Sequence, residues 1–348
     1  MVLCSAKIMV LVLLVLQNTC LVLTMRYSRT LPGTMYLGST AVACDEAMKL
    51  VTCTLVLLGT YLCSGEDETA RSFGAFMQRE VFSQPKEFLK MGGLAALYTV
   101  QKNLLYAAVS NLDAAVFQIT YQTKILTTAM FSVLLLGRSL DRKKVLALLL
   151  LTIGVGLVQL DKVDKKASQS SQPQSHIVGV LAVLGACCTS GFGGVYFEMV
   201  LKKGQGAPGY RPPSVWAKNV QLSLFAFSIA LATAFVKDAV AIAEGGFFQG
   251  YSPLVVTVIA LEAGGGLVVA IVIKYADNIL KSFATAVSII TSTIVSMYVF
   301  DFKVTQLFTV GSVFVFVAIR LYSQPPPKQK VVPPEDPKDQ ERLLNEKV

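Results

Sequence analysis

Lysines within apolar segments are the residues of this sequence best suited to bind a ligand. Lys124 lies in the apolar stretch 114–136, where Gln118 and Tyr121 stand on neighbouring turns of the same helical face. A charge inside a membrane helix is costly and marks a functional site by default. Beside a phenol and an amide, this ammonium group suits an anionic ligand. An internal ion pair with a buried carboxylate is the alternative.

Three further lysines raise the same question. Lys102, with Tyr98 one turn before it, interrupts another apolar stretch and is too central to reach the membrane surface without strain. We expect it to line a water-filled cavity that attracts anions. Lys49 follows Glu46 by three residues, so it either pairs with that carboxylate or faces the ligand. Lys281 opens a later apolar stretch, either as a ligand contact or as an anchor at the membrane interface.

Glycine-rich runs interrupt two other apolar stretches. Ser190-Gly191-Phe192-Gly193-Gly194 and Gly264-Gly265-Gly266 leave room for a neighbouring helix or for a flat ligand. Close helix packing is the commoner explanation for each run, and neither has the pattern of a phosphate-binding loop. Glu198 and Lys202, four residues apart, are predicted to form an ordinary pair at a helix end.

The sequence lacks the residues that enzymes and metal sites require. Its single histidine, His176, is predicted to lie in a polar loop, and its seven cysteines form no CxxC motif. A serine triad needs a well-placed histidine, and a zinc site needs clustered His and Cys ligands. We therefore expect no catalytic residue, no metal and no cofactor, and the chain is predicted not to be an enzyme.

Composition places the chain among membrane proteins. Of its 348 residues, 53% are hydrophobic and only 15% are charged, against about 25% charged in a soluble domain. A spanning helix needs roughly 20 apolar residues, and apolar segments of about this length recur along the chain. The prediction is an all-α membrane protein with ten transmembrane helices, near residues 5–25, 38–62, 89–108, 114–136, 145–160, 177–200, 215–236, 252–273, 279–300 and 304–322.

Basic residues predict the orientation of these helices. The net charge is +9, but the excess lies between apolar runs and at their ends, so nucleic acid is not an expected partner. Cytosolic loops of membrane proteins are rich in Lys and Arg. Both termini are predicted to be cytosolic, although Lys162, Lys165 and Lys166 on the opposite side oppose this orientation. The clusters that support it are Arg138, Arg142, Lys143 and Lys144; Lys202, Lys203 and Arg211; and Lys328, Lys330, Lys338, Arg342 and Lys347.

A weak internal repeat relates the two halves of the chain. Residues 109–136 align without a gap on 273–300, so that Asp113 meets Asp277. The repeat unit is then about five helices long. An odd number of crossings forces the second copy into inverted topology, and inverted repeats place a substrate site at their interface. This arrangement indicates a carrier.

The chain is accordingly divided as follows. A transporter domain covers 1–322, with repeats at about 1–160 and 177–322. Residues 323–348 are predicted to be a disordered cytosolic tail. Segment 66–88 is predicted to be an amphipathic linker on the membrane surface.

Five motifs together resemble the nucleotide-sugar transporter family. They are Tyr98-Thr99-Val100-Gln101, Ser110-Asn111-Leu112-Asp113-Ala114-Ala115, Thr120-Tyr121-Gln122 with Lys124, Ser190-Gly191-Phe192 with Gly194-Val195-Tyr196-Phe197-Glu198, and Lys274-Tyr275-Ala276-Asp277-Asn278-Ile279-Leu280-Lys281. The similarity extends to about Tyr322 and is strongest to the subfamily for UDP-galactose, UDP-N-acetylglucosamine and CMP-sialic acid. It implies the ten-helix drug/metabolite transporter fold, a Golgi location and exchange of cytosolic nucleotide sugar for lumenal nucleoside monophosphate.

The resemblance also implies a binding site. The family's binding lysines match Lys124 and Lys281, and by position Lys49. Further pocket positions are occupied by Tyr98, Tyr121, Gly191, Gly194 and Asn219.

The chain departs from the family pattern at three places. Where the family has Asn-Asn, this chain has Lys102-Asn103, and an added cation there would alter substrate preference. Ser223 replaces an aromatic residue of the cytidine carrier, which favours uridine substrates. Ser282 stands where a glycine is usual.

The expected function is a Golgi antiporter that exchanges cytosolic UDP-galactose or UDP-N-acetylglucosamine for lumenal UMP. Lys124 and Lys281 would neutralise the diphosphate, while Tyr98, Tyr121 and Asn219 orient base and ribose. A CMP-sialic acid transporter, a non-transporting membrane scaffold of the same fold and a membrane-embedded sugar transferase are the alternatives. Besides UDP-sugar and UMP we expect membrane lipid as a partner. A homodimer and association with a glycosyltransferase stay open.

Overall fold

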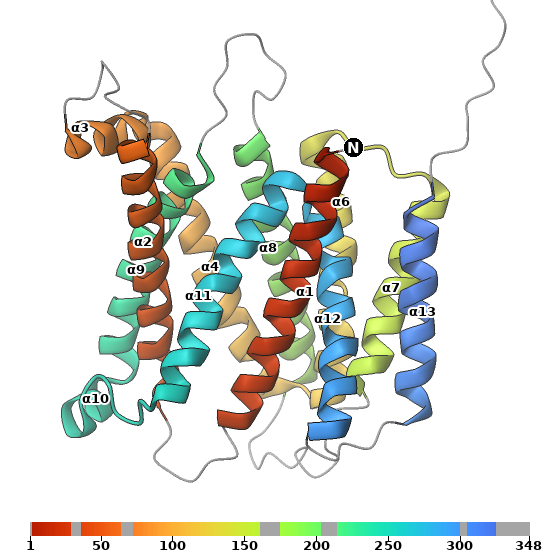
Figure 1. Cartoon of the computed structure of the whole chain (residues 1–348). Coiled ribbons are helices and arrows are strands. Elements are labelled where there is room, and N and C mark those ends of the chain that lie inside the picture. Colours follow the sequence, from red (N-terminus) through yellow and green to blue (C-terminus); the bar gives the residue numbers. More distant parts are fainter. Residues whose placement is uncertain are drawn as a thin grey trace, which may run out of the picture.

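The computed structural model describes residues 2–28, 36–63, 72–160, 175–202, 214–299 and 305–324, which form helices and turns without a strand (Figure 1). Each predicted apolar segment lies on one or two of these helices. Lys162, Lys165, Lys166, Lys203, Arg211 and the tail beyond residue 324 lie outside the described residues. The elements are α1 (Val2–Ser28), α2 (Gly38–Cys63), α3 (Phe73–Met77), η1 (Gln78–Phe82), α4 (Pro85–Asn111), α5 (Ala114–Tyr121), α6 (Lys124–Leu136), α7 (Arg142–Leu160), α8 (His176–Lys202), α9 (Val215–Lys237), α10 (Ala239–Gly245), α11 (Pro253–Tyr275), α12 (Asn278–Val299) and α13 (Gln306–Tyr322).

Seven stretches of the described chain are long and apolar enough to cross a membrane. They are Ala6–Met25, Val116–Leu136, Arg142–Leu160, His176–Lys202, Val215–Lys237, Pro253–Tyr275 and Asn278–Val299. Helix α13 is shorter, with 17 residues. The chain is therefore an all-helical, multi-pass membrane protein. His176 begins α8 rather than lying in the preceding loop, and its side chain is exposed.

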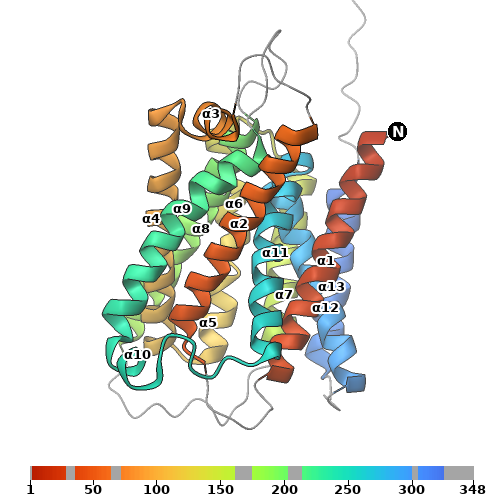
Figure 2. The same ribbon diagram turned by 60° about the vertical axis from the view of Figure 1, so that its left-hand side comes forward.

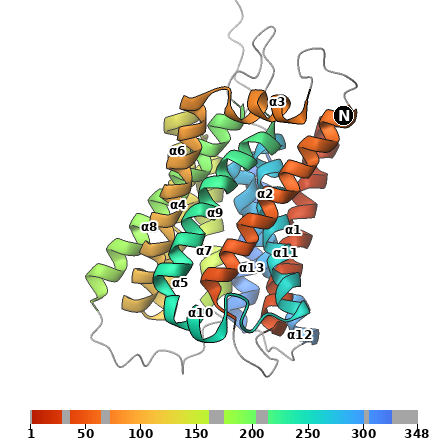
Figure 3. The same ribbon diagram turned by 90° about the vertical axis from the view of Figure 1, so that its left-hand side faces the viewer.

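The two ends of the helical bundle differ. The start of α1 and the end of α13 lie at the same end, together with the α6–α7 connection (Figures 1 and 2). Short helix α3 lies across this end, and α10 lies at the opposite end (Figure 3). We call them the α3 end and the α10 end.

The predicted helix 114–136 is present, with a tighter turn at Gln122 and Thr123. Backbone N–H groups of Gln122 and Thr123 bond to carbonyls three residues back, 3.1 Å to Ile119 and 3.0 Å to Thr120. The side-chain amide of Gln122 also donates to its own helix, to the Gln118 carbonyl at 3.2 Å. Such local bonds compete with the regular helical ladder. The turn divides the span into α5 and α6, and Lys124 directly follows it within the continuous stretch Val116–Leu136.

Helices from the two halves of the chain interleave. Helix α1 packs against α11 and α12, and α8 packs against α4 and α6. Helix α2 packs on α9, and α7 on α13. The last pair meets backbone to backbone: a Cβ on Gly154 would lie 2.8 Å from the carbonyl oxygen of Gly311. Small residues at such crossings let membrane helices approach closely.

The described part of linker 66–88 packs on the protein. Phe76 of α3 is buried, and its ring lies 5.5 Å from the ring of Tyr61 on α2. The side-chain amide of Gln221 on α9 donates to the carbonyl of Val81 in η1 at 2.5 Å. Part of the apolar side of this linker therefore packs on α2 and α9, whereas Phe82 is exposed.

Candidate substrate-binding site

Lys124 directly follows the turn between α5 and α6. Its Nζ atom lies 4.1 Å from the centre of the Tyr121 ring, which stacks on Phe117 at 5.6 Å. The Tyr121 hydroxyl group hydrogen-bonds with Gln101 of α4. A cation over an aromatic face is stabilised without a carboxylate. Lys124 thus has an aromatic partner and forms no ion pair with any described residue.

Lys281 lies in the first turn of α12. The carboxylate of Asp277 caps this helix by accepting the backbone N–H of Leu280 at 2.7 Å. Within the described chain, the Lys281 side chain makes neither a hydrogen bond nor an ion pair. Its charge interacts electrostatically with Lys124 and with Glu198. Because the two lysines repel each other, an anion bound between them would be stabilised by both.

Tyr98 lies on the face of α4 that meets α8. Its ring is half-buried, and a Cβ on Gly193 would lie 3.0 Å from its Cε1 atom. One turn further along α4, Gln101 bonds to Tyr121. The structure therefore brings Tyr98, Tyr121 and Lys124 to the region where α4, α5, α6 and α8 meet.

Gly191 and Gly194 lie at helix crossings. A Cβ on Gly191 would lie 2.7 Å from Oγ1 of Thr127 on α6, and a Cβ on Gly194 would overlap the Asn278 side chain of α12. Both glycines are buried. They set the approach of α8 to the helices that carry Lys124 and Lys281, which is the packing explanation for this run.

Asn219 is buried on α9 and bonds within its own helix. Its amide donates to the Val215 carbonyl at 2.8 Å. Helix α9 packs on α2 and α4. Across the described residues, no hydrogen bond joins Asn219 to the other predicted site residues.

Lys49 is paired with acidic neighbours on its own helix. Its Nζ atom lies 2.8 Å from Oε1 of Glu46 and 3.2 Å from Oδ2 of Asp45. Of the two alternatives, the structure has the intrahelical pair. The Lys49 stem packs against Gly266 of α11, where a Cβ would lie 3.0 Å from Cδ.

Lys102 is exposed on α4, and its charge interacts with Asp45 of α2 and Glu262 of α11. It forms no ion pair with any described residue. The Lys102 charge thus acts on α2 and α11. Helix α4 itself packs mainly on α8 and α9.

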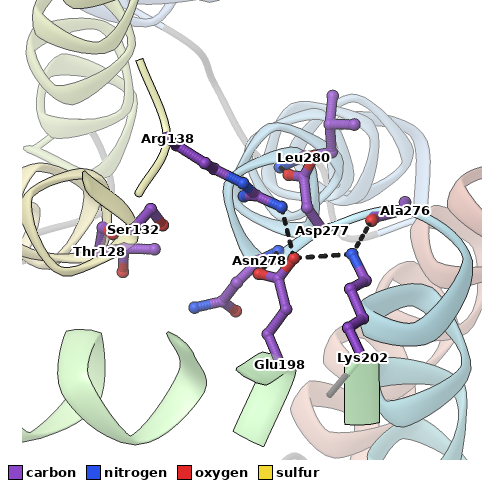
Figure 4. Close-up of polar contacts among 9 residues, drawn as sticks. All are labelled: Thr128, Ser132, Arg138, Glu198, Lys202, Ala276, Asp277, Asn278 and Leu280. Carbon is purple, nitrogen blue, oxygen red and sulfur yellow. Dashed lines mark hydrogen bonds and ion pairs between the residues drawn. The ribbon is translucent and has the colours of Figure 1, made fainter. Parts of the chain in front are cut away.

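Glu198 is the centre of an ionic network at the α3 end (Figure 4). Its fully buried carboxylate places Oε1 at 2.6 Å from Nη2 of Arg138 and 2.7 Å from Nζ of Lys202. Its Oε2 accepts the backbone N–H of Asn278 at 3.0 Å, and Lys202 also donates to the Ala276 carbonyl at 2.5 Å. The predicted helix-end pair is present, but it is part of a junction between the α6–α7 connection, α8 and the start of α12.

Comparison with known proteins decides the family. A family model described as nucleotide-sugar transporter matches residues 3–323. The chain belongs to the nucleotide-sugar transporter family. It is 45% identical to the UDP-N-acetylglucosamine transporter of Mus musculus, over 92% of this chain and 96% of that protein. It is 43% identical to the UDP-galactose translocator of Canis lupus familiaris, over 92% of this chain and 77% of that protein. These relatives are transporters, so membership of the family also confirms that the chain is not an enzyme.

A solved crystal structure shares the fold of this nucleotide-sugar transporter. Its TM-score is 0.61 at 12% identity, over 92% of this chain and 96% of that chain. At this identity the likeness concerns the fold alone.

Two features of the site were missed from the sequence. Arg138 was assigned to a basic loop that sets orientation, whereas it also reaches the buried Glu198. Asp45 and Glu262 were not singled out, although each is an acidic residue within an apolar helix. The cost of charge in a membrane helix was the signal that could have identified them.

Proposed function

We propose that this nucleotide-sugar transporter is a Golgi antiporter that exchanges cytosolic UDP-N-acetylglucosamine or UDP-galactose for lumenal UMP. The proposal rests chiefly on Lys124 and Lys281, two mutually repelling ammonium groups that have no acidic partner at ion-pair distance within the described part of the chain. Their combined charge matches the two negative charges of a nucleotide diphosphate. We choose a uridine nucleotide because the relatives are named as a UDP-N-acetylglucosamine transporter and a UDP-galactose translocator.

Exchange follows from the same charges. An empty site leaves two cations close together in surroundings of low polarity, which costs free energy. A bound nucleotide offsets this repulsion and allows the two halves of the protein to move around it. Either UDP-sugar or UMP supplies the phosphate, so each crossing requires a nucleotide. Tyr98, Tyr121 and Asn219 are proposed to orient base and ribose, and Gly191 and Gly194 to position the surrounding helices.

We propose an architecture of ten spans in two inverted repeats, which allows access to alternate around a site at their interface. In it, α1, α2, α4, α5–α6 and α7 correspond to α8, α9, α11, α12 and α13. Pairs of helix contacts support the correspondence. The contact of α4 with α8 corresponds to the contact of α11 with α1, and the contact of α6 with α8 corresponds to that of α12 with α1. Likewise α4 on α9 corresponds to α11 on α2. Asp113 and Asp277 each immediately precede a helix, α5 and α12.

Orientation follows from the basic connections. The α6–α7 connection, which contains Arg138, lies at the α3 end, as do the start of α1 and the end of α13 (Figure 1). Arg142, Lys143 and Lys144 follow in the first turn of α7. We assign this end to the cytosol because Lys and Arg are enriched in cytosolic loops. The α10 end would then face the Golgi lumen.

Uptake into proteoliposomes tests the proposal. Purified protein is reconstituted in vesicles loaded with UMP, and uptake of labelled UDP-N-acetylglucosamine, UDP-galactose and CMP-sialic acid is compared. Lys124→Ala should abolish exchange. Lys237→Ala is the matched control, since Lys237 also lies over a tyrosine ring, at 4.2 Å from the centre of Tyr106.

The outcomes separate the alternatives. Loss of exchange in Lys124→Ala alone supports the carrier site. Preference for CMP-sialic acid would replace the uridine assignment, and no uptake by the wild-type protein would favour a scaffold. Equal uptake into vesicles without UMP would contradict obligatory exchange.

A further inference from the structure

A second group of charges lies within the bundle, on three helices. Asp45, Glu46 and Lys49 are on α2, Lys102 is on α4 and Glu262 is on α11. Lys49 is bound by its two acidic neighbours, with its side chain only 14% exposed. Lys102 interacts electrostatically with Asp45 and Glu262 without forming an ion pair within the described chain. The group therefore contains charges that face one another without being paired.

This group shares helix α4 with the site of Lys124. Lys102 lies four residues after Tyr98, on the same side of the helix, and next to Gln101, which bonds to the tyrosine that supports Lys124. Glu262 is four residues before Gly266, against which the Lys49 stem packs, so both lie on one face of α11. Lys102 therefore links these charges to the part of α4 that contributes Tyr98 and Gln101 to the Lys124 site.

The charges favour an uncharged ligand rich in hydroxyl groups. Three carboxylates and two ammonium groups give a formal charge of minus one, which repels a further carboxylate. Oδ2 of Asp45 is bound to Lys49, whereas Oδ1 is buried and has no hydrogen-bond partner among the described residues. A buried acceptor without a partner is unusual and needs an explanation. A sugar hydroxyl is a suitable donor, and its bond to a carboxylate is stronger than one between neutral groups.

We propose that Asp45, Lys102 and Glu262 form the subsite for the hexosyl group and select neutral sugars over sugars that carry a carboxylate. The two carboxylates accept hydrogen bonds from hydroxyl groups of the sugar, and Lys102 donates a hydrogen bond to a hydroxyl or carbonyl oxygen of the sugar. The inference rests on the proposed function, because it assumes a UDP-sugar held at Lys124. It also gives a role to Lys102, the residue at which the chain departs from its family's Asn-Asn pattern.

Selectivity measured in proteoliposomes tests this subsite. Asp45→Asn, Glu262→Gln and Lys102→Asn are reconstituted in vesicles loaded with UMP. Uptake of labelled UDP-N-acetylglucosamine, UDP-galactose, UDP-glucuronate and UMP is measured for each. Glu87→Gln is the control, since Glu87 is also an acidic residue paired with a lysine three residues on, with Lys90 at 2.7 Å, but at the start of α4.

The ratio of uptake separates a sugar contact from a structural role, because UMP lacks the hexosyl group. A lost hydrogen bond to a charged group corresponds to about tenfold or more in affinity. We therefore expect the ratio of UDP-hexose to UMP uptake to fall about tenfold in Asp45→Asn and in Glu262→Gln. The ratio of UDP-glucuronate to UDP-hexose uptake should rise in both, and Glu87→Gln should match the wild type.

The results that overturn the subsite are distinct from those that overturn the function. Equal loss of UMP and UDP-hexose uptake would make these residues structural. Unchanged ratios would remove them from the substrate path. If the wild-type protein exchanged UMP for no UDP-sugar, the proposed function itself would fall.

Discussion

Replacing Glu198 by Gln should destabilise the protein, because its carboxylate is the shared partner of two cations. The side chain is fully buried, with Arg138 at 2.6 Å and Lys202 at 2.7 Å from the same oxygen, Oε1. Glutamine keeps the shape and one acceptor oxygen but removes the negative charge. Arg138 and Lys202 are then left facing each other.

The structure sets the magnitude. Since both cations contact one oxygen, they lie at most about 5 Å apart and repel by about 3 kcal/mol or more at an effective dielectric constant of about 20. Removing one member of a buried ion pair costs about 3–5 kcal/mol. Arg138 and Lys202 are 28% and 21% exposed, so solvent screens part of this repulsion. We expect a loss of about 2–3 kcal/mol in the free energy of unfolding.

A double-mutant cycle measures the effect in purified, detergent-solubilised protein. Arg138→Gln should destabilise the wild-type protein but recover part of the stability lost in Glu198→Gln, because it removes one of the two repelling cations. Glu87→Gln is the control at the outer pair of α4 and should cost less than about 1 kcal/mol. If the Glu198 and Arg138 changes were simply additive, the shared-carboxylate account would be wrong.

Three other changes have predicted outcomes. Gly154→Ala should lower the unfolding temperature, because the added Cβ would lie 2.8 Å from the Gly311 carbonyl oxygen. Gly156→Ala, with open space at its Cβ, should not lower it, and comparable melting curves for the two variants would contradict this. Lys281→Met should abolish exchange while leaving the unfolding temperature unchanged or raised, since this lysine has no described ion-pair partner; a large drop in stability would show a structural role. Tyr121→Leu should weaken UMP inhibition of uptake about two- to fivefold by removing the aromatic partner of Lys124, and Tyr121→Phe should retain it; equal inhibition constants would refute the contact.

Helix positions were predictable because apolar run length directly reflects the thickness of the bilayer. The predicted segments 38–62 and 215–236, for example, differ from α2 and α9 by one residue at a single end. The tighter turn between α5 and α6 was not predicted. It lies at Gln122 and Thr123, where the sequence has neither the Gly nor the Pro that usually marks a turn.

Pairing within a helix was easier to predict than pairing between helices. The Glu46–Lys49 contact follows from a spacing of three residues and was one of two stated alternatives. The Arg138–Glu198 contact joins residues 60 positions apart. It depends on the packing of α6 on α8, which apolar periodicity does not specify.

The interleaving of the two halves has a consequence for synthesis of the protein. Helix α1 is made first, yet its buried residues Val10 and Leu14 pack with residues of α11 and α12, and its Gln17 amide donates to the Leu261 carbonyl of α11 at 2.8 Å. During translation, these contacts and this hydrogen bond can form only after α11 is inserted. A chain that stops before α11 would lack the α11 partner of this amide and part of the surface that buries Val10 and Leu14.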